Sequence, residues 1–190
     1  MKKLATIAAF IAGLLTIACG DKDFRSYQSL VERELKKPRV DSIFFGISLA
    51  MPVKQFYVHC WDLNKQGLFT DGMGNTKINY QLVNQELDHP ADMNFYPAFI
   101  DGKIASMEVL FQYHGWGPWT RELNSDKLLP DVLQLFEKWY PGGNPFISME
   151  DPKRGKIYIK VDGNRRIILG LYDDTQVKAD FSDLSQNTKL

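Results

Sequence analysis

The most decisive structural signal in the sequence is Asn94-Phe-Tyr-Pro-Ala-Phe-Ile100, followed by Asp101-Gly102 and then Lys103-Ile-Ala-Ser-Met-Glu-Val-Leu-Phe-Gln-Tyr113. Asp-Gly between two β-rich runs is a strong signal for a two-residue hairpin turn. In the second run, apolar residues alternate with Ser106, Glu108 and Gln112. Successive side chains of a strand point to opposite faces, so one face is expected to be buried and the other to meet water.

Further β signals lie on both sides of this hairpin. Runs rich in Ile, Val, Phe and Tyr predict strands, and turn residues separate them. The expected strands are residues 42–49, 77–83, 146–150, 156–161, 165–172 and 176–181. Asp162-Gly163 is expected to form a second two-residue turn. The carboxyl half of the chain therefore repeats the pattern of strands joined by short turns.

Three segments carry helical periodicity. The first follows Asp23 and ends near Lys37, the second begins at Pro52 and ends near Gly67, and the third begins near Pro130. The apolar stripe of the second consists of Val53, Phe56, Tyr57, Cys60 and Leu63. A thiol in the middle of such a stripe behaves as a small hydrophobic group, which predicts a buried, inert Cys60.

The order of these elements predicts an α+β fold, with amphipathic helices packed on one face of an antiparallel sheet. Each half of the chain reads as a helix followed by strands, so two helix-plus-strands units are expected. Residues 24–182 are interpreted as a single domain, or as subdomains 24–120 and 121–182. Residues 183–190 are expected to form a polar tail.

The amino terminus has the pattern of an export signal. Two lysines precede an uncharged apolar run that ends at Ala18, directly before Cys19. This segment resembles a bacterial lipoprotein signal. The resemblance implies removal of residues 1–18 and a lipid on the Cys19 thiol, which attaches the protein to a membrane, with residues 19–23 as a tether. Gly20 in place of Asp makes the outer membrane the expected location.

Composition and charge limit the classes of partner. The chain is 44% hydrophobic and 13% aromatic, which is typical of a folded protein. Its formal charge is 23 − 23 = 0, and removal of Lys2 and Lys3 with the signal makes it 21 − 23 = −2. Nucleic acid binding needs a basic surface, so no nucleic acid is expected as a partner. With Cys19 lipidated, Cys60 is the one remaining thiol and no internal disulfide is expected.

A second resemblance involves Gly46-Ile-Ser-Leu-Ala50-Met51-Pro52, which leads into the second helix. It is similar to the helix start of small outer-membrane lipoproteins of the SmpA/OmlA type, which are similar in turn to the β-lactamase-inhibitor-protein-like fold. That group usually has Gly-Met-Thr where this chain has Ala50-Met51-Pro52. The resemblance implies a fold of helix-helix-strand units and a protein that binds other proteins without chemistry of its own.

The candidate binding site is the loop that follows the decisive hairpin. It contains His114, Trp116 and Trp119 among glycines and a proline. Loops on rigid scaffolds often carry binding function, and Trp offers a large flat face to a protein or a sugar. The sequence therefore indicates a site for an envelope protein or for a glycan or other small molecule. The alternative is that both indoles complete the core.

No local motif of catalysis is present. The chain lacks the zinc-protease, nucleophile-elbow, phosphate-loop and dinucleotide patterns, so no cofactor and no metal are expected. An exported hydrolase would need His114, His89 or His59 to meet a nucleophile or a carboxylate in the fold. Paired acids such as Asp173-Asp174 lie where turns are expected, which explains them as turn residues. The sequence favours a non-catalytic binding module.

Overall fold

The computed structural model describes residues 18–83 and 86–186. The first 17 residues of the expected signal and the last four of the expected tail lie outside the described residues. The helices are α2 (Ala18–Glu34), α3 (Val53–Lys65) and α4 (Ser125–Trp139), with short 3₁₀ turns η1 (Met73–Asn75) and η2 (Arg121–Leu123). The strands are β1 (Thr70–Asp71), β2 (Ile78–Leu82), β3 (Ala91–Ile100), β4 (Lys103–Tyr113), β5 (Ile147–Asp151), β6 (Gly155–Asp162), β7 (Arg165–Leu171) and β8 (Gln176–Asp183).

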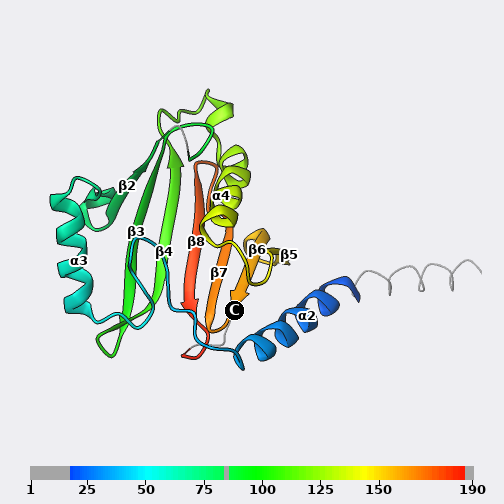
Figure 1. The fold of residues 1–190 in the computed structure, drawn as a ribbon. Coiled ribbons are helices and arrows are strands. Elements are labelled where there is room, and N and C mark those ends of the chain that lie inside the picture. The colour runs from blue at the N-terminus through cyan, green and yellow to red at the C-terminus, as the bar shows by residue number, and fades with distance from the viewer. Residues whose placement is uncertain (1–17, 84–85, 187–190) are drawn as a thin grey trace, which may run out of the picture.

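These eight strands form one antiparallel sheet in the order β1-β2-β3-β4-β8-β7-β6-β5 (Figure 1). Each half of the chain is a meander of four neighbouring strands preceded by a helix, α3 or α4. The last strands of the two halves, β4 and β8, pair at the centre of the sheet. The mixed α+β class is confirmed, and the two expected units share one continuous sheet.

The decisive hairpin forms as the sequence indicates. Asp101 and Gly102 take φ values of 50° and 70° between β3 and β4. A two-residue turn of this kind needs positive φ at both central positions, which Asp and Gly tolerate. The second turn is shifted by one residue, because Asp162 pairs with Arg165 and leaves Gly163 and Asn164 in the turn. This shift frees the Asp162 side chain for buried contacts with Arg165 and Lys160.

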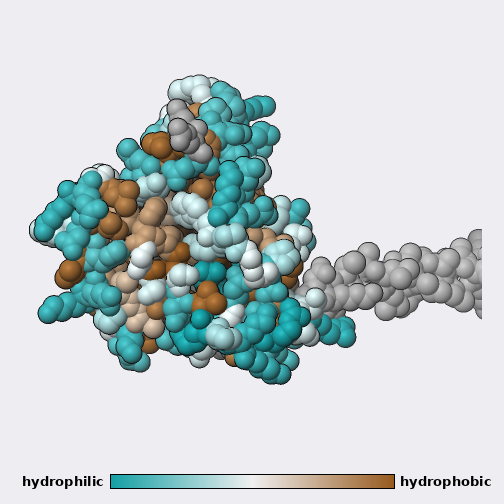
Figure 2. Space-filling model, viewed as in Figure 1, coloured by the Kyte–Doolittle hydropathy of each residue, from teal (hydrophilic) through white to brown (hydrophobic). Residues whose placement is uncertain are grey.

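The main core lies between the sheet and α4. Val132, Leu135 and Phe136 of α4 are buried. They belong to one cluster with the alternate residues of the central strands, including Phe95, Val109 and Phe181. α4 begins five residues before Pro130, so the proline lies inside the helix rather than at its first turn. Figure 2 shows hydrophilic surface over α3 and α4 and hydrophobic residues in several separate patches.

The helices do not all pack on one face of the sheet, so this part of the prediction is wrong. α2 contacts β6, where Tyr27 joins Ile157, Ile159 and Ile168 in a second cluster. These side chains alternate along their strands with those of the α4 core, so α2 lies on the opposite face. The Tyr27 hydroxyl accepts a hydrogen bond from Arg166 Nη1 at 3.1 Å. Residues 19–23, expected as a tether, belong to α2, whose first turn lies away from the sheet (Figure 1).

α3 lies beside the edge of β3. β2 pairs with β3 only as far as Phe95, which leaves the rest of that edge without a neighbouring strand. The Phe56 ring packs there, 6.2 Å from the ring of Tyr96 and 5.8 Å from that of Phe99. α3 begins after Pro52 and is followed by Gly67, with φ of 74°, as the sequence predicts.

The segment of residues 42–49 is buried but is not the expected strand. Ile43 and Ile47 bond to each other across a tight turn that contains Phe45 and Gly46, both with positive φ. The apolar residues that favoured a strand instead fill the core from this turn. At the carboxyl end, β8 continues to Asp183, and Leu184 is buried, so the described chain is packed beyond residue 182. Among the described helices, none is long and apolar enough to cross a membrane.

Candidate functional site

The face of the sheet opposite α4 carries a polar surface between α2 and α3, which we call the open face. It is formed by the alternate residues of β2, β3, β4, β8 and β7 that point away from the core. They include Tyr96, Ser106, Glu108, Lys178, Asp180 and Ser182. Glu108 and its neighbours on β4 are the residues that the alternating pattern assigns to the water-facing side, so the sequence contained this signal.

A chain of ion pairs runs across the open face. Glu108 accepts from Lys77 Nζ at 2.5 Å and from Lys178 Nζ at 2.8 Å. Lys178 also lies 3.3 Å from Asp180, which is 3.6 Å from Arg154. Glu108 and Asp180 stand directly opposite each other on β4 and β8, where like charges repel. The ammonium of Lys178 between the two carboxylates offsets this repulsion.

Burial and these ion pairs shift the pKa values of Glu108, Lys178 and Asp180. Hydrogen bonds from Lys178 and Lys77 lower the pKa of Glu108, although burial opposes them. Burial raises the pKa of Asp180 despite its two cationic neighbours. Burial lowers the pKa of Lys178, but Glu108 and Asp180 outweigh this effect and raise it overall. The two carboxylates therefore differ, and Asp180 is the one that accepts a proton more readily.

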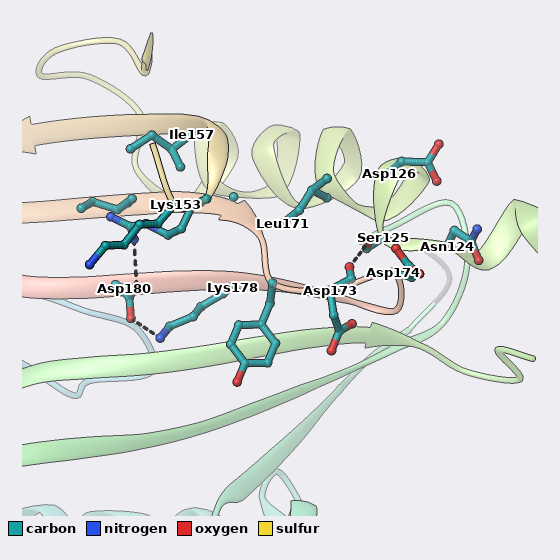
Figure 3. A pocket seen from close by; sticks show the side chains of 14 residues that line it. Asn124, Ser125, Asp126, Lys153, Ile157, Leu171, Asp173, Asp174, Lys178 and Asp180 are labelled. Atoms are coloured by element: carbon teal, nitrogen blue, oxygen red, sulfur yellow. Dashed lines mark hydrogen bonds and ion pairs between the residues drawn. The ribbon is translucent and has the colours of Figure 1, made fainter. Parts of the chain in front are cut away.

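Two hollows adjoin this chain of ion pairs. One, of about 600 Å³, lies between the start of α4, the β5–β6 turn and the β7–β8 turn. In Figure 3, Lys153 and Lys178 lie toward one end of it and Asp173 and Asp174 toward the other. The second hollow, of about 540 Å³, lies over β3, β4 and β8. Arg154 and Asp180 line both, so the open face is a continuous, uneven, charged surface.

The loop that follows β4 contains His114, Trp116 and Trp119, and its two tryptophans lie in different environments. The Trp116 indole is half-buried and donates from Nε1 to Asn124 Oδ1 at 3.0 Å. Trp119 is 83% exposed. His114 lies 3.0 Å from Asp92, and both side chains are partly exposed. The structure thus fixes Trp116 against the fold and leaves Trp119 on the surface, and none of these three residues lines the two hollows.

Among the described residues, the three histidines contact different groups. His59 Nε2 is 2.6 Å from the carbonyl oxygen of Phe45, and the His89 ring packs edge-on against Tyr113. His114 meets a carboxylate, Asp92, on the surface. Within the described ranges, no group of three or more His, Cys, Asp or Glu side chains is arranged to hold a metal ion.

The other chemical candidates have structural explanations. Cys60 is buried as predicted, and burial raises the pKa of its thiol to about 12, which disfavours the reactive thiolate at neutral pH. Asp173 Oδ1 accepts the backbone N–H groups of Thr175 and Gln176, which confirms its interpretation as a turn residue.

The geometry provides surfaces for binding. The sequence did not indicate the hollows, because they depend on strands that are far apart in the chain. Comparison with known protein families, with curated proteins and with solved structures finds no match for this chain.

Proposed function

We propose that this protein is a non-catalytic binding module, held at a bacterial outer membrane by a lipid on Cys19, that binds another envelope protein through its open face. The observation that carries this proposal is the hollowed, charged surface across β3, β4, β8 and β7. A protein interface needs complementary shape and paired polar groups over roughly 800 Å² of each partner. The open face offers two hollows and a row of charged side chains over the central strands.

The charges of the open face favour a partner that presents an acidic side chain. The hollow over β3, β4 and β8 is lined by the cations Lys77, Arg154 and Arg166 and by the anions Glu108 and Asp180. Cations thus exceed anions by 3 − 2 = 1 among its lining residues. Arg154 lies 3.5 Å from Asp151 and 3.6 Å from Asp180, both long for a strong ion pair. Its guanidinium therefore retains donors for a carboxylate of a partner.

The conformation of Ala50 supports the resemblance to SmpA/OmlA-type lipoproteins. Ala50 takes φ of 61°, a conformation in which glycine is favoured. Those lipoproteins usually have glycine at this position. Each meander of four strands directly follows one helix, α3 or α4, which differs from the helix-helix-strand unit that the resemblance implies, so Ala50 carries this support. On this basis we propose the same kind of function, binding to another protein.

The partner is tested with a photo-crosslinking residue placed at Ser106 on the open face of the full-length protein in intact cells. The matched control carries the same residue at Lys138, which is exposed on α4. The expected result is a discrete adduct from position 106 and none from position 138. Arg154→Glu is expected to abolish the adduct, and Lys138→Glu to leave it unchanged. Adducts that are identical from both positions, or insensitive to Arg154→Glu, would overturn the proposal.

The lipid anchor is tested separately. Cys19→Ala is expected to stop the incorporation of labelled palmitate and to release the protein from the membrane fraction. Cys60→Ala is the control, and it is expected to leave both unchanged because the Cys60 thiol is buried. Labelling that persists in Cys19→Ala would show that the lipid is attached elsewhere, and a wild-type protein that takes up no label would show that there is no lipid.

A further inference from the structure

A groove between α3 and the β1–β2 hairpin is a second surface with features of a binding site. We call it the α3 groove, and its volume is about 410 Å³, within the usual range of ligand sites. One wall is the stripe Tyr57, Cys60, Trp61 and Asn64, which recurs at helical spacing. The opposite wall is residues 69–71 and 75–78, and Tyr96 of β3 also lines the groove.

The exposed aromatic rings of this groove are unusual for a helix surface. Trp61 is 65% exposed and Tyr57 is 50% exposed. Trp61 lies at the rim of the groove. Lys65 Nζ lies 5.5 Å from the centroid of the Trp61 ring, so this cation holds the indole and leaves its other face for a ligand. The Tyr57 hydroxyl is 2.6 Å from that of Tyr96, which fixes a second ring.

Polar groups beside these rings have no partner among the described residues. The Asp71 carboxylate, the Asn75 amide and the Trp61 indole N–H form no hydrogen bond or ion pair there. By contrast, Asn64 donates from Nδ2 to the carbonyl oxygen of Phe69 at 2.8 Å, which joins the two walls. Buried Asn94 fixes the far wall, because its side-chain oxygen accepts the Met73 N–H at 2.9 Å. Two hydrogen bonds thus tie the walls of the groove, which retains donors and acceptors for a ligand.

We infer that the α3 groove binds a neutral oligosaccharide of β-linked, gluco-configured pyranose rings. Such rings carry their hydroxyl groups equatorially, so each ring has flat C–H faces that pack on an indole or a phenol. Their hydroxyl groups donate to a carboxylate such as Asp71 and bond to an amide such as Asn75. A small-molecule site usually consists of aromatic and other apolar side chains with a few polar groups among them. Asp71 and Lys77 both line the groove, so its lining has no net charge, which favours a neutral ligand. This inference does not rest on the proposed protein partner.

The test follows the four tryptophan indole N–H signals of the full-length chain by NMR, in a detergent that has no sugar headgroup. Chitotetraose and cellotetraose are the probes, since both are β-1,4-linked chains of gluco-configured rings. The expected result is that at least one probe at millimolar concentration shifts the Trp61 signal and leaves that of Trp119 in place. The absence of any shift with both probes, or a shift confined to Trp119, would overturn the inference.

Variants then test which residues of the α3 groove contact the probe. Trp61→Ala is expected to weaken binding by at least about tenfold, because it removes the ring on which the sugar packs. Trp61→Phe is expected to recover part of this loss, and Asp71→Asn to weaken binding severalfold. Trp119→Ala is the matched control, because Trp119 is an exposed tryptophan outside the groove. A Trp61→Ala protein that retains its circular dichroism spectrum and binds the probe as tightly as wild type would also overturn the inference.

Discussion

Arg39 places its guanidinium 2.8 Å from a carboxylate oxygen of Asp183, and this ion pair joins the segment after α2 to the end of β8. The Asp183 side chain is fully buried, whereas that of Arg39 is 46% exposed. Arg39→Ala leaves a buried carboxylate with fewer partners. We expect the free energy of unfolding to fall by about 1–3 kcal/mol, less than for a fully buried pair because solvent screens Arg39. Urea denaturation measures this, and exposed Lys36→Ala, expected within about 0.5 kcal/mol of wild type, is the control.

The same carboxylate predicts a dependence of stability on pH. Burial raises the pKa of Asp183, but hydrogen bonds from Ser185, Arg39 and Asn164 outweigh it and lower the pKa overall. A carboxyl group with a lower pKa in the folded state contributes stability above its unfolded pKa of about 3.9 and loses it as the pH falls through the folded value. Asp183→Asn is therefore expected to be less stable at neutral pH and to lose less stability below about pH 4. Parallel acid-unfolding curves for the two proteins would contradict this.

Gly163 is expected to be intolerant of a side chain. Its φ is 57°, and a β-carbon there would lie 2.6 Å from the carbonyl oxygen of Pro38. Gly163→Ala is therefore expected to lower the free energy of unfolding by about 2–4 kcal/mol, from strain and the clash together. Gly102 is the matched control, because its φ is 70° and a β-carbon there would meet nothing within 4 Å. Gly102→Ala is expected to cost about 1 kcal/mol, so equal losses in thermal unfolding would contradict the clash.

Ala50 is expected to gain stability when replaced by glycine. Its φ of 61° strains a residue that has a β-carbon, and glycine relieves this strain. The expected gain is about 0.5–1 kcal/mol, after subtraction of the cost from the greater chain entropy that glycine gives the unfolded state. Ala98, exposed in β3 outside the left-handed region, is the control, and Ala98→Gly is expected to destabilise. Chemical denaturation in which Ala50→Gly is the less stable protein would refute this.

The two loop tryptophans are expected to differ in their contribution to stability. Trp116 is half-buried and bonded to Asn124, so Trp116→Ala loses packing and leaves a polar partner without its donor. We expect a loss of about 2–3 kcal/mol in the free energy of unfolding. Trp119→Ala is expected to change it by less than about 0.5 kcal/mol, since the indole is 83% exposed. Thermal unfolding of both variants separates the two roles, and equal losses would contradict them.

The sequence predicted the elements better than their arrangement. Asp101-Gly102 and the alternation from Ala105 to Tyr113 depend on neighbouring residues, so the central hairpin was correct. The strand expected over residues 42–49 was wrong, because composition alone cannot distinguish a buried strand from a buried turn. Gly46, with φ of 79°, was the local signal for a turn. The placement of α2 opposite α4 depends on long-range packing that periodicity does not encode.

For the candidate surfaces too, the sequence indicated single residues but not the residues that they meet in the fold. Alternation in β4 assigned Glu108 to the side that meets water, but its partners are Lys77, which directly precedes β2, and Lys178 on β8. The α3 groove needs Trp61 from a helix and Asn75 from a distant turn. The sequence does not show whether a tryptophan is exposed or buried. Only the fold shows that Trp61 and Trp119 are exposed and that Trp116 is half-buried.

The pairing of β4 with β8 has a consequence for how the chain folds. Every other pairing in the sheet joins strands that are neighbours in sequence, whereas this one joins residues 106–112 to residues 176–182. Closing a long loop costs more entropy than closing a hairpin, and long-range contacts slow folding. We therefore expect the two meanders to assemble first and the central seam to close last. Until that seam closes, each meander presents an unpaired edge to other chains.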